Sequence, residues 1–317
     1  MVGRIPLIDV EAKYKPELVT INSDVTFSYF SDHIIAEMKK ENRLGNAKAY
    51  DNAKIIFNKL MGDSVLIQNV SEDMVNEFIH KMILKKLSIN SRGVHLRAIR
   101  ATINRAIKDG IYDASNYPFK NISIKTQKTR KRAVNKDVIK MVEELDVSKE
   151  NNLQFYKDLF MFSFYNRGMN FVDISFLKTK NIESGRISYY RQKTGHQFSI
   201  KLTDKAKVII DRYSKLKDPE SYIFPIIYRK GNEYLDYKNA MRLMNKKLKK
   251  ISKILELDVP LTTYVTRHSW ATIAKRSGIS TAIISEGLGH ESEETTQVYL
   301  DSFENDVLDD ANELIIS

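Results

Sequence analysis

Apolar side chains recur at steps of three and four residues from Thr26 to about Gly110, the spacing of one face of an α-helix. Ser71 stands where a helix would begin, and Gly62 and Gly110 stand where helices would end. The pattern predicts four short amphipathic helices that pack as a compact bundle. Their apolar faces are Phe27, Phe30, Ile34, Ile35 and Met38; Ala49, Ala53, Ile56, Phe57 and Leu60; Met74, Phe78, Ile79 and Met82; and Val94, Leu96, Ile99, Ile103, Ala106 and Ile107.

The second part of the chain, from about Asn135 to the end, is also mostly helical, but one stretch changes period. Two short alternating segments, RISYYRQ and HQFSIKL, flank Lys-Thr-Gly, which is typical of a β-hairpin. This part is therefore predicted to be helical with a small β-insert. Helices are expected at 138–145, 153–164, 203–216 and 237–255, around Arg267, Ile283 and Tyr299, and over a last run with Val307, Leu308, Ala311, Leu314 and Ile315.

The segment YPFKNISIKTQKTRKRAV separates the two parts. No acidic residue stands between Asp113 and Asp137, whereas basic residues accumulate there. Such a run is usually only a solvated connection, but on a DNA-binding protein it can follow the phosphate backbone, and we favour that interpretation. The expected organisation is an N-terminal extension (1–25), a helical domain (26–115), a basic linker (116–134) and a second domain (135–317). The candidate DNA-binding residues are Lys125, Lys128, Arg130, Lys131 and Arg132.

The composition fits a globular protein with an anionic partner. The 317 residues suffice for two domains, 42% of them are apolar, and the formal charge is +11. This charge favours nucleic acid, although a Lys-rich surface alone would also produce it. The chain has no cysteine, which excludes disulfides, thiolate zinc sites and cysteine nucleophiles. Without a secretory signal or an apolar run of about 20 residues, we expect a cytoplasmic protein that does not cross a membrane.

Hydrolysis that depends on a metal or a nucleotide has no visible motif in the chain. Neither HExxH, nor a close cluster of His, Asp and Glu, nor GxxxxGK[ST] appears, so no metal site and no cofactor are expected. A phosphoryl transfer without them needs a protein nucleophile, a general acid and cations that stabilise the transition state.

Four residues are of the right type for that chemistry. Tyr299 is a candidate nucleophile, and Arg267 can hold two phosphate oxygens at once. His290 can donate to a nonbridging oxygen, and Lys193, at the hairpin tip, can act as an acid. Singly, each is more often a packed aromatic, a surface charge or a flanking histidine. Their order, and the nine residues from His290 to Tyr299, favour the chemical role.

The run from Arg167 to the end resembles the catalytic domain of the tyrosine recombinases, the phage-integrase family. That family has an early arginine, a lysine on a β-hairpin, a His-x-x-Arg helix, a Leu-Gly-His turn and a tyrosine about nine residues further on. The segments FYNRGMNFVDISFLK, TRHSWAT and LGHESEETTQVYL match this order. The segments FYNRGMNFVD and YVTRHSWA look most like those of the branch found in Bacteroides and its relatives.

The four-helix part resembles the family's core-binding domain, which clamps the opposite face of DNA, so the resemblance covers about residues 24–315. It implies a mainly α fold with a small β-insert, in which a four-helix core-binding domain precedes the tyrosine-recombinase catalytic domain.

The first arginine departs from the family's pattern. It usually stands three residues before an acidic residue, but here Asp173 has Asn170 in that place. The nearest arginine is Arg167, one helical turn further back, where it can share the same face. We assign the role of the first arginine to Arg167.

The His-x-x-Arg helix departs too, because Tyr264 occupies the histidine position. A tyrosine can donate a hydrogen bond to a phosphate but is a poor general base near neutral pH, since its usual pKa is about 10. His268 stands beside Arg267 but points about 100° away on an ideal helix, so we interpret it as a structural histidine.

The resemblance implies a cofactor-independent strand exchange in double-stranded DNA. Tyr299 would form a 3′-phosphotyrosyl link and free a 5′-hydroxyl, Lys193 would protonate the leaving oxygen, and the other catalytic residues would hold the transition state. Family members act as tetramers that pass a C-terminal helix to a neighbour, and the apolar stripe from Val307 to Ile315 suits that role or packing on its own chain. The residues carried over as transition-state ligands are Arg167, Arg267 and His290.

Two other functions stay open at this point. A type IB topoisomerase shares these side-chain roles but relaxes supercoils, and a catalytically silent DNA-binding regulator would tolerate the two departures. Only about 25 residues precede the first expected helix, too few for the arm-binding domain that many integrases carry. We therefore hypothesise a simple recombinase, such as a DNA invertase that acts on short inverted repeats.

Overall fold

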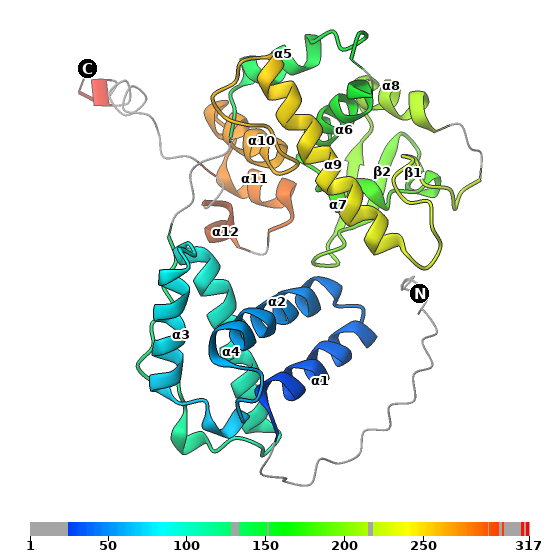
Figure 1. Ribbon diagram of the computed structural model, residues 1–317. Helices are drawn as coiled ribbons and strands as arrows, with labels where there is room; N and C mark the ends of the chain where they lie inside the picture. The colour runs from blue at the N-terminus through cyan, green and yellow to red at the C-terminus, as the bar shows by residue number, and fades with distance from the viewer. Residues whose placement is uncertain are drawn as a thin grey trace. The chain divides into compact units, whose positions relative to one another are not determined.

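The computed structural model describes residues 25–127, 133–150, 152–214, 218–290 and 292–297, together with Leu300 and residues 312, 313, 315 and 316. The chain divides into two compact units, Met1–Thr129 and Arg130–Ser317, each drawn in Figure 1. Each unit has its own hydrophobic core. The division falls inside the basic segment at 116–134, of which Lys128, Arg130, Lys131 and Arg132 lie outside the described residues.

The N-terminal unit contains the four predicted helices, α1 (Phe27–Lys40), α2 (Leu44–Met61), α3 (Glu72–Leu84) and α4 (Ile89–Lys108). The side chain of Ser71 accepts a hydrogen bond from the backbone N–H of Met74 and so satisfies a donor at the start of α3. Phe27, Phe57 and Phe78 meet in the core, with ring centroids 4.4 and 5.3 Å apart. The predicted four-helix unit is confirmed.

The C-terminal unit is mainly helical, as predicted. The long helix begins at Glu233, four residues earlier than expected, because buried Asp236 accepts hydrogen bonds from the backbone and side chain of Arg229 and organises the first turn. The short helix α7 was not predicted. The helices are α5 (Lys136–Glu144), α6 (Leu153–Tyr165), α7 (Phe171–Ser175), α8 (Asp204–Tyr213), α9 (Glu233–Ile254), α10 (Val265–Arg276), α11 (Thr281–Leu288) and α12 (Glu293–Gln297).

The β-insert is a three-stranded antiparallel sheet of β1 (Ile182–Glu183), β2 (Arg186–Tyr190) and β3 (Gln197–Lys201). The strands β2 and β3 are the predicted hairpin. Tyr189 pairs with Phe198, and the two buried rings stack with centroids 5.2 Å apart. The strand β1 was not predicted, because two residues show no alternation.

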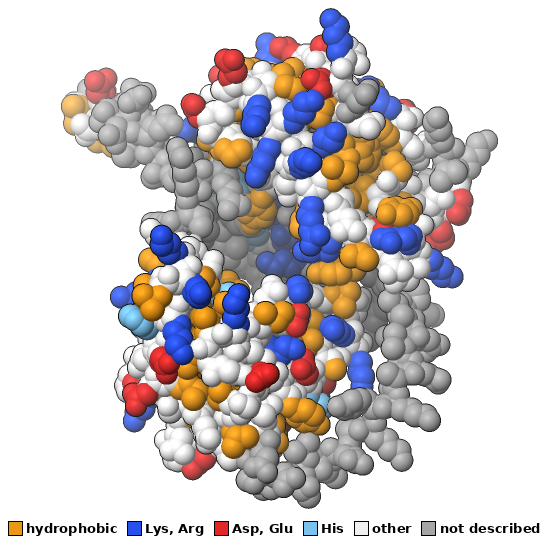
Figure 2. Space-filling model, viewed as in Figure 1, with side chains coloured by type: hydrophobic (Ala, Val, Ile, Leu, Met, Phe, Trp, Pro, Cys, Tyr) orange, Lys and Arg blue, Asp and Glu red, His pale blue; other side chains and the backbone are white. Residues whose placement is uncertain are grey.

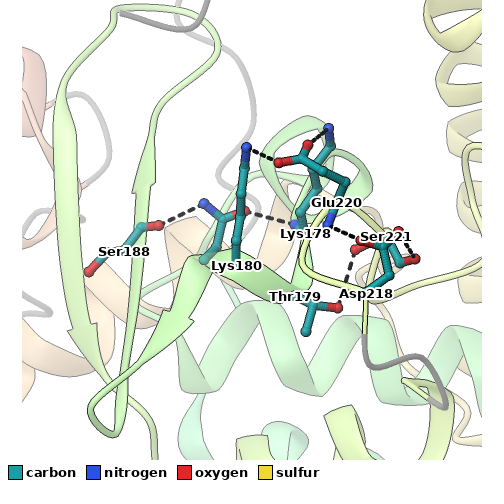
Figure 3. Close-up of polar contacts among 8 residues, drawn as sticks. Lys178, Thr179, Lys180, Ser188, Asp218, Glu220 and Ser221 are labelled. Carbon is teal, nitrogen blue, oxygen red and sulfur yellow. Dashed lines mark hydrogen bonds and ion pairs between the residues drawn. The ribbon is translucent and has the colours of Figure 1, made fainter. Parts of the chain in front are cut away.

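The edge of the sheet is fastened to the loop that carries Glu220 (Figure 3). Lys178 and Lys180 pair with the Glu220 carboxylate at 2.8 and 2.5 Å, and these bonds lower the pKa of Glu220 to about 2. The side-chain amide of Asn181 donates to the backbone oxygen of Ser188 on β2 at 2.9 Å. These contacts hold the base of the hairpin and so limit where its tip can lie.

The helices α10, α11 and α12 form a small layer of their own, drawn in orange and brown in Figure 1. They bury Ala271, Ile284 and Leu288 together with Leu300. A Cβ at Gly287 would lie 2.8 Å from the Trp270 ring, so the glycine lets α11 pack closely on α10. No helix in the described ranges is long and apolar enough to cross a membrane.

Candidate active site

Arg267 on α10 is a buried arginine, only 3% exposed, rather than a surface charge. Its Nη2 donates to the backbone oxygen of Leu288 and lies 3.2 Å from Nε2 of His290. Its Nη1 donates to the backbone oxygen of Gly168 at 3.5 Å. Three segments that are far apart in the sequence therefore converge on one guanidinium group.

Gly168 brings the turn after α6 against the backbone of α10. Its φ of +68° lies in the left-handed region, and a Cβ there would stand 2.4 Å from Cα of Arg267. The hydroxyl of Ser163 bonds to the backbone oxygen of Met169 and to the hydroxyl of Thr266, each at 2.7 Å, and holds the same contact from α6. The close approach explains why a glycine follows Arg167.

Replacing Gly168 with alanine is expected to displace α10 and to lower the free energy of unfolding by at least about 2 kcal/mol, through backbone strain and overpacking. The DNA cleavage predicted from the sequence should fall with it, because the displaced backbone carries Arg267. The matched control is Gly185→Ala, which has a similar φ of +70° but open space around its Cβ. Urea denaturation measures both variants, and equal losses would contradict the role assigned to the close contact.

His290 follows Gly289 in the turn that ends α11. The φ of Gly289 is +60°, and a Cβ there would lie 2.5 Å from Cζ of Phe198, so this turn packs directly on the hairpin. Burial and the charges of Arg267, Arg191 and Lys193 lower the pKa of His290 to about 4. The imidazole is therefore neutral near pH 7, and the hairpin-tip Lys193 lies close enough for its charge to act on the ring.

Arg191, which the sequence analysis did not select, belongs to the same cluster. It follows β2 directly and is 8% exposed. Its Nη1 donates to the backbone oxygen of Gly289 at 3.3 Å. Since the positive charge of Arg191 also acts on His290, a second guanidinium stands beside the pair formed by Arg267 and His290.

Asn170, the N-cap of α7, and Asp173, inside that helix, support the segment of Arg191. With its amide oriented by hydrogen bonding, Asn170 accepts from Nη2 and Nε of Arg191 at 3.2 and 3.3 Å. Buried Asp173 accepts from the backbone N–H of Gln192 at 2.9 Å. Burial raises the pKa of Asp173, while the Gln192 bond and the charge of Arg191 oppose the rise. Asn170, which stands at the position of the family's first arginine, thus orients Arg191, which follows β2.

Period-two alternation was the signal that could have found Arg191. Ile187 and Tyr189 are buried, and Arg191 continues their face of the strand, whereas Tyr190 is 60% exposed. A charged residue at an inward position is unusual. Arg167 lies half-buried in the turn after α6 with a φ of +57°, and its charge, like those of Arg267 and Arg191, acts on Tyr189.

Of the other predicted site residues, Tyr264 and His268 lie in the described ranges and Tyr299 does not. Tyr264 is the residue that precedes α10, 38% exposed, and its ring meets His268 edge-on with centroids 4.8 Å apart. Tyr299 lies outside the described residues, between α12 and buried Leu300. Within the described ranges, no three His, Asp or Glu side chains gather in a way that could hold a metal ion.

The positive charge of this unit gathers on α9, the helix that crosses the face shown in Figure 2. Its cations follow steps of three and four residues and so form one stripe. Arg242, Lys246, Lys249 and Lys253 are exposed, and Lys238 lies over the rings of Tyr234 and Tyr237. Such a stripe is the arrangement expected for contact with a polyanion.

Comparison with known proteins shows which family the chain belongs to. The model of the phage integrase family matches residues 136–306, which is more than half of the chain. The chain belongs to the phage integrase family. The family's SAM-like domain matches residues 26–124, the four-helix unit. The prediction of a tyrosine recombinase that breaks and rejoins DNA is confirmed, and the Bacteroides branch stays a prediction.

Among curated relatives, the tyrosine recombinase XerA of Pyrococcus furiosus is 25% identical over 70% of this chain and 73% of its own length. XerA of Saccharolobus solfataricus is 27% identical, but the match spans only 42% of each chain.

Solved structures share the fold at low identity. A lambda integrase dimer bound to a COC′ core site is 16% identical with a TM-score of 0.65 and covers 93% of this chain and 85% of that one. A lambda integrase tetramer bound to a Holliday junction is 17% identical with a TM-score of 0.66 and covers 92% and 82%. These likenesses support the mainly α fold with its β-insert.

Proposed function

We propose that this chain is a site-specific recombinase in which Tyr299 attacks a DNA phosphodiester held by Arg267, Arg191 and His290. The observation that carries the proposal is the convergence of these three groups from α10, the hairpin and the turn after α11. Guanidinium groups offer paired donors to phosphate oxygens, and in a buried site their charge is poorly screened.

One bond to phosphorus forms as another breaks, so the reaction needs no cofactor. The phenolic oxygen of Tyr299 bonds to phosphorus as the bond from phosphorus to the 5′-oxygen breaks, and the phenolic proton passes to water. Lys193 gives a proton to the 5′-oxygen, which leaves as a hydroxyl. The hydroxyl of Tyr264, the residue before α10, donates a hydrogen bond to the same phosphate. Reversal with a new 5′-hydroxyl rejoins the strands.

In this proposal Arg167 does not contact the phosphate, but its positive charge acts on the site from the turn after α6. It lies in the turn whose Gly168 receives Arg267, and its charge reaches Tyr189 on the hairpin. Asn170 and Asp173 position Arg191, and His268 packs against Tyr264.

Double-stranded DNA is the proposed partner, and the cytoplasm is the proposed compartment. The α9 stripe and the basic segment with Lys125 supply cations for phosphates. A homotetramer on two sites is the proposed assembly, supported by the lambda integrase tetramer on a Holliday junction. For the biological event we propose inversion between short inverted repeats. Footprints at distant arm sites would contradict inversion.

A nicked DNA site that loses its short 5′-hydroxyl fragment after cleavage tests the chemistry. The expected product is a covalent adduct, and mass spectrometry of its tryptic peptides should place the nucleotide on Tyr299. No adduct from the wild type would favour a silent regulator. Relaxation of plasmids that lack a specific site, without exchange of strands, would favour a topoisomerase.

A further inference from the structure

Thr296 on α12 contacts the ring nitrogen of His290 that does not face Arg267. Its side chain is fully buried, and its Oγ1 lies 2.8 Å from Nδ1 of His290. The other ring nitrogen, Nε2, lies 3.2 Å from Nη2 of Arg267. Both edges of the imidazole are therefore in contact with polar groups, one on α12 and one on α10.

The Arg267 contact fixes the tautomer in the DNA-free protein. A guanidinium group only donates hydrogen bonds, so Nε2 must present its lone pair to Arg267. A neutral imidazole then carries its proton on Nδ1, which donates to Thr296. The low pKa of His290 agrees with a neutral ring.

Contact with a phosphate requires the opposite arrangement. A phosphate oxygen accepts hydrogen bonds, so Nε2 would have to carry a proton in order to contact it. In the DNA-free site burial and the nearby cations oppose a charged ring, and the negative charge of a bound phosphate acts against them. The arrangement that adds no charge to the ring is a neutral imidazole with its proton on Nε2 and a lone pair on Nδ1.

We propose that Thr296 is a positioning residue that serves both tautomers of His290, because its hydroxyl can accept from Nδ1–H or donate to the Nδ1 lone pair. When DNA enters, Arg267 turns Nη2 toward the phosphate, one proton leaves Nδ1 for water, and one from water reaches Nε2. His290 then donates to a nonbridging oxygen without a change of charge. This inference rests on the proposed role of His290 in phosphate binding.

Thr296 also connects His290 to the segment of the chain that carries Tyr299. The backbone oxygen of Thr296 accepts from the N–H of Leu300 at 3.1 Å, and Tyr299 is the residue before Leu300. The hydrogen bond from His290 to Thr296 thus joins the phosphate-binding turn to the segment that holds the attacking residue.

Selective ¹⁵N labelling of histidine tests the proposal by NMR. In the free protein, the His290 signals, assigned by their loss in His290→Gln, should show a protonated Nδ1 and an unprotonated Nε2. With DNA bound to the uncleaving Tyr299→Phe variant, the protonated nitrogen should become Nε2. A free protein with the proton on Nε2, or no change on DNA binding, would overturn the inference.

Cleavage of the nicked substrate at saturating DNA gives an independent readout. Thr296→Val keeps the shape but lacks the hydroxyl, so the rate of adduct formation should fall by about 10²- to 10³-fold, as when one hydrogen-bond donor to the developing charge is lost. Thr296→Ser should stay within about threefold of the wild type, since it keeps the hydroxyl.

Thr295→Val is the matched control, because Thr295 is exposed on the same short helix and its hydroxyl contacts Ser292 at 3.1 Å. Equal rates for Thr296→Val and the control would refute the role of Thr296. Absence of an adduct in the wild type would instead refute the proposed function. Since the NMR readout of the free protein needs no variant at Thr296, misfolding of Thr296→Val would not remove the test.

Discussion

Replacement of Tyr299 by phenylalanine is expected to abolish the covalent link to DNA and to slow strand cleavage by about 10⁴-fold or more. The substitution removes only the hydroxyl that is proposed to attack phosphorus, and a two-step exchange through a covalent intermediate needs that nucleophile. Binding should persist, because the cations that contact phosphate are unchanged. The expected result is therefore an enzyme that binds its site and does not cut it.

The measurement pairs a gel shift with denaturing electrophoresis of the nicked substrate. Tyr228→Phe is the control, since Tyr228 is 73% exposed and its ring contacts Arg229 rather than the cluster around Arg267. That variant should form adduct at the wild-type rate. An adduct with Tyr299→Phe, mapped to another tyrosine, would show that the nine-residue spacing from His290 had been misread.

Local rules predicted most of the helices, because their evidence lies within a few residues. Ser71 and Thr203 cap helices where the sequence places them, each accepting from a backbone N–H three residues on. The β2–β3 hairpin follows from alternation in the same way. The short helix α7 and the strand β1 were missed, since five and two residues are too few to show a period.

The site was harder to predict, because its parts meet only in the folded chain. Arg267 and His290 were predicted from spacing, and the structure brings them to 3.2 Å. Arg191 was missed because the expected arginine was sought near Asp173 in the sequence. Asn170, at the start of α7, accepts hydrogen bonds from Arg191, at the end of β2. The two residues are 21 positions apart in the sequence, so no local pattern predicts this contact.

Arg191→Ala is expected to slow adduct formation by about 10³-fold, the order of effect seen when a phosphate-clamping arginine is removed. The loss should fall on the cleavage step at saturating DNA, because a buried guanidinium acts mainly on charge that develops in the transition state. Arg191→Lys should recover little, since a lysine lacks the planar fork that reaches both Gly289 and Asn170. Urea denaturation of each variant would separate lost folding from lost chemistry.

Arg167→Ala and Arg186→Ala complete the comparison. Arg186 begins the same strand, is exposed and bonds to Ser199, so its loss should leave cleavage unchanged. Arg167→Ala should cost less than Arg191→Ala, because Arg167 is half-buried and, in the proposal, does not contact the phosphate. A larger loss from Arg167→Ala would return the first-arginine role to the residue chosen from the sequence. Partial recovery of Arg191→Ala by Asn170→Arg would show that both positions can supply the same guanidinium, one from α7 and the other from the hairpin.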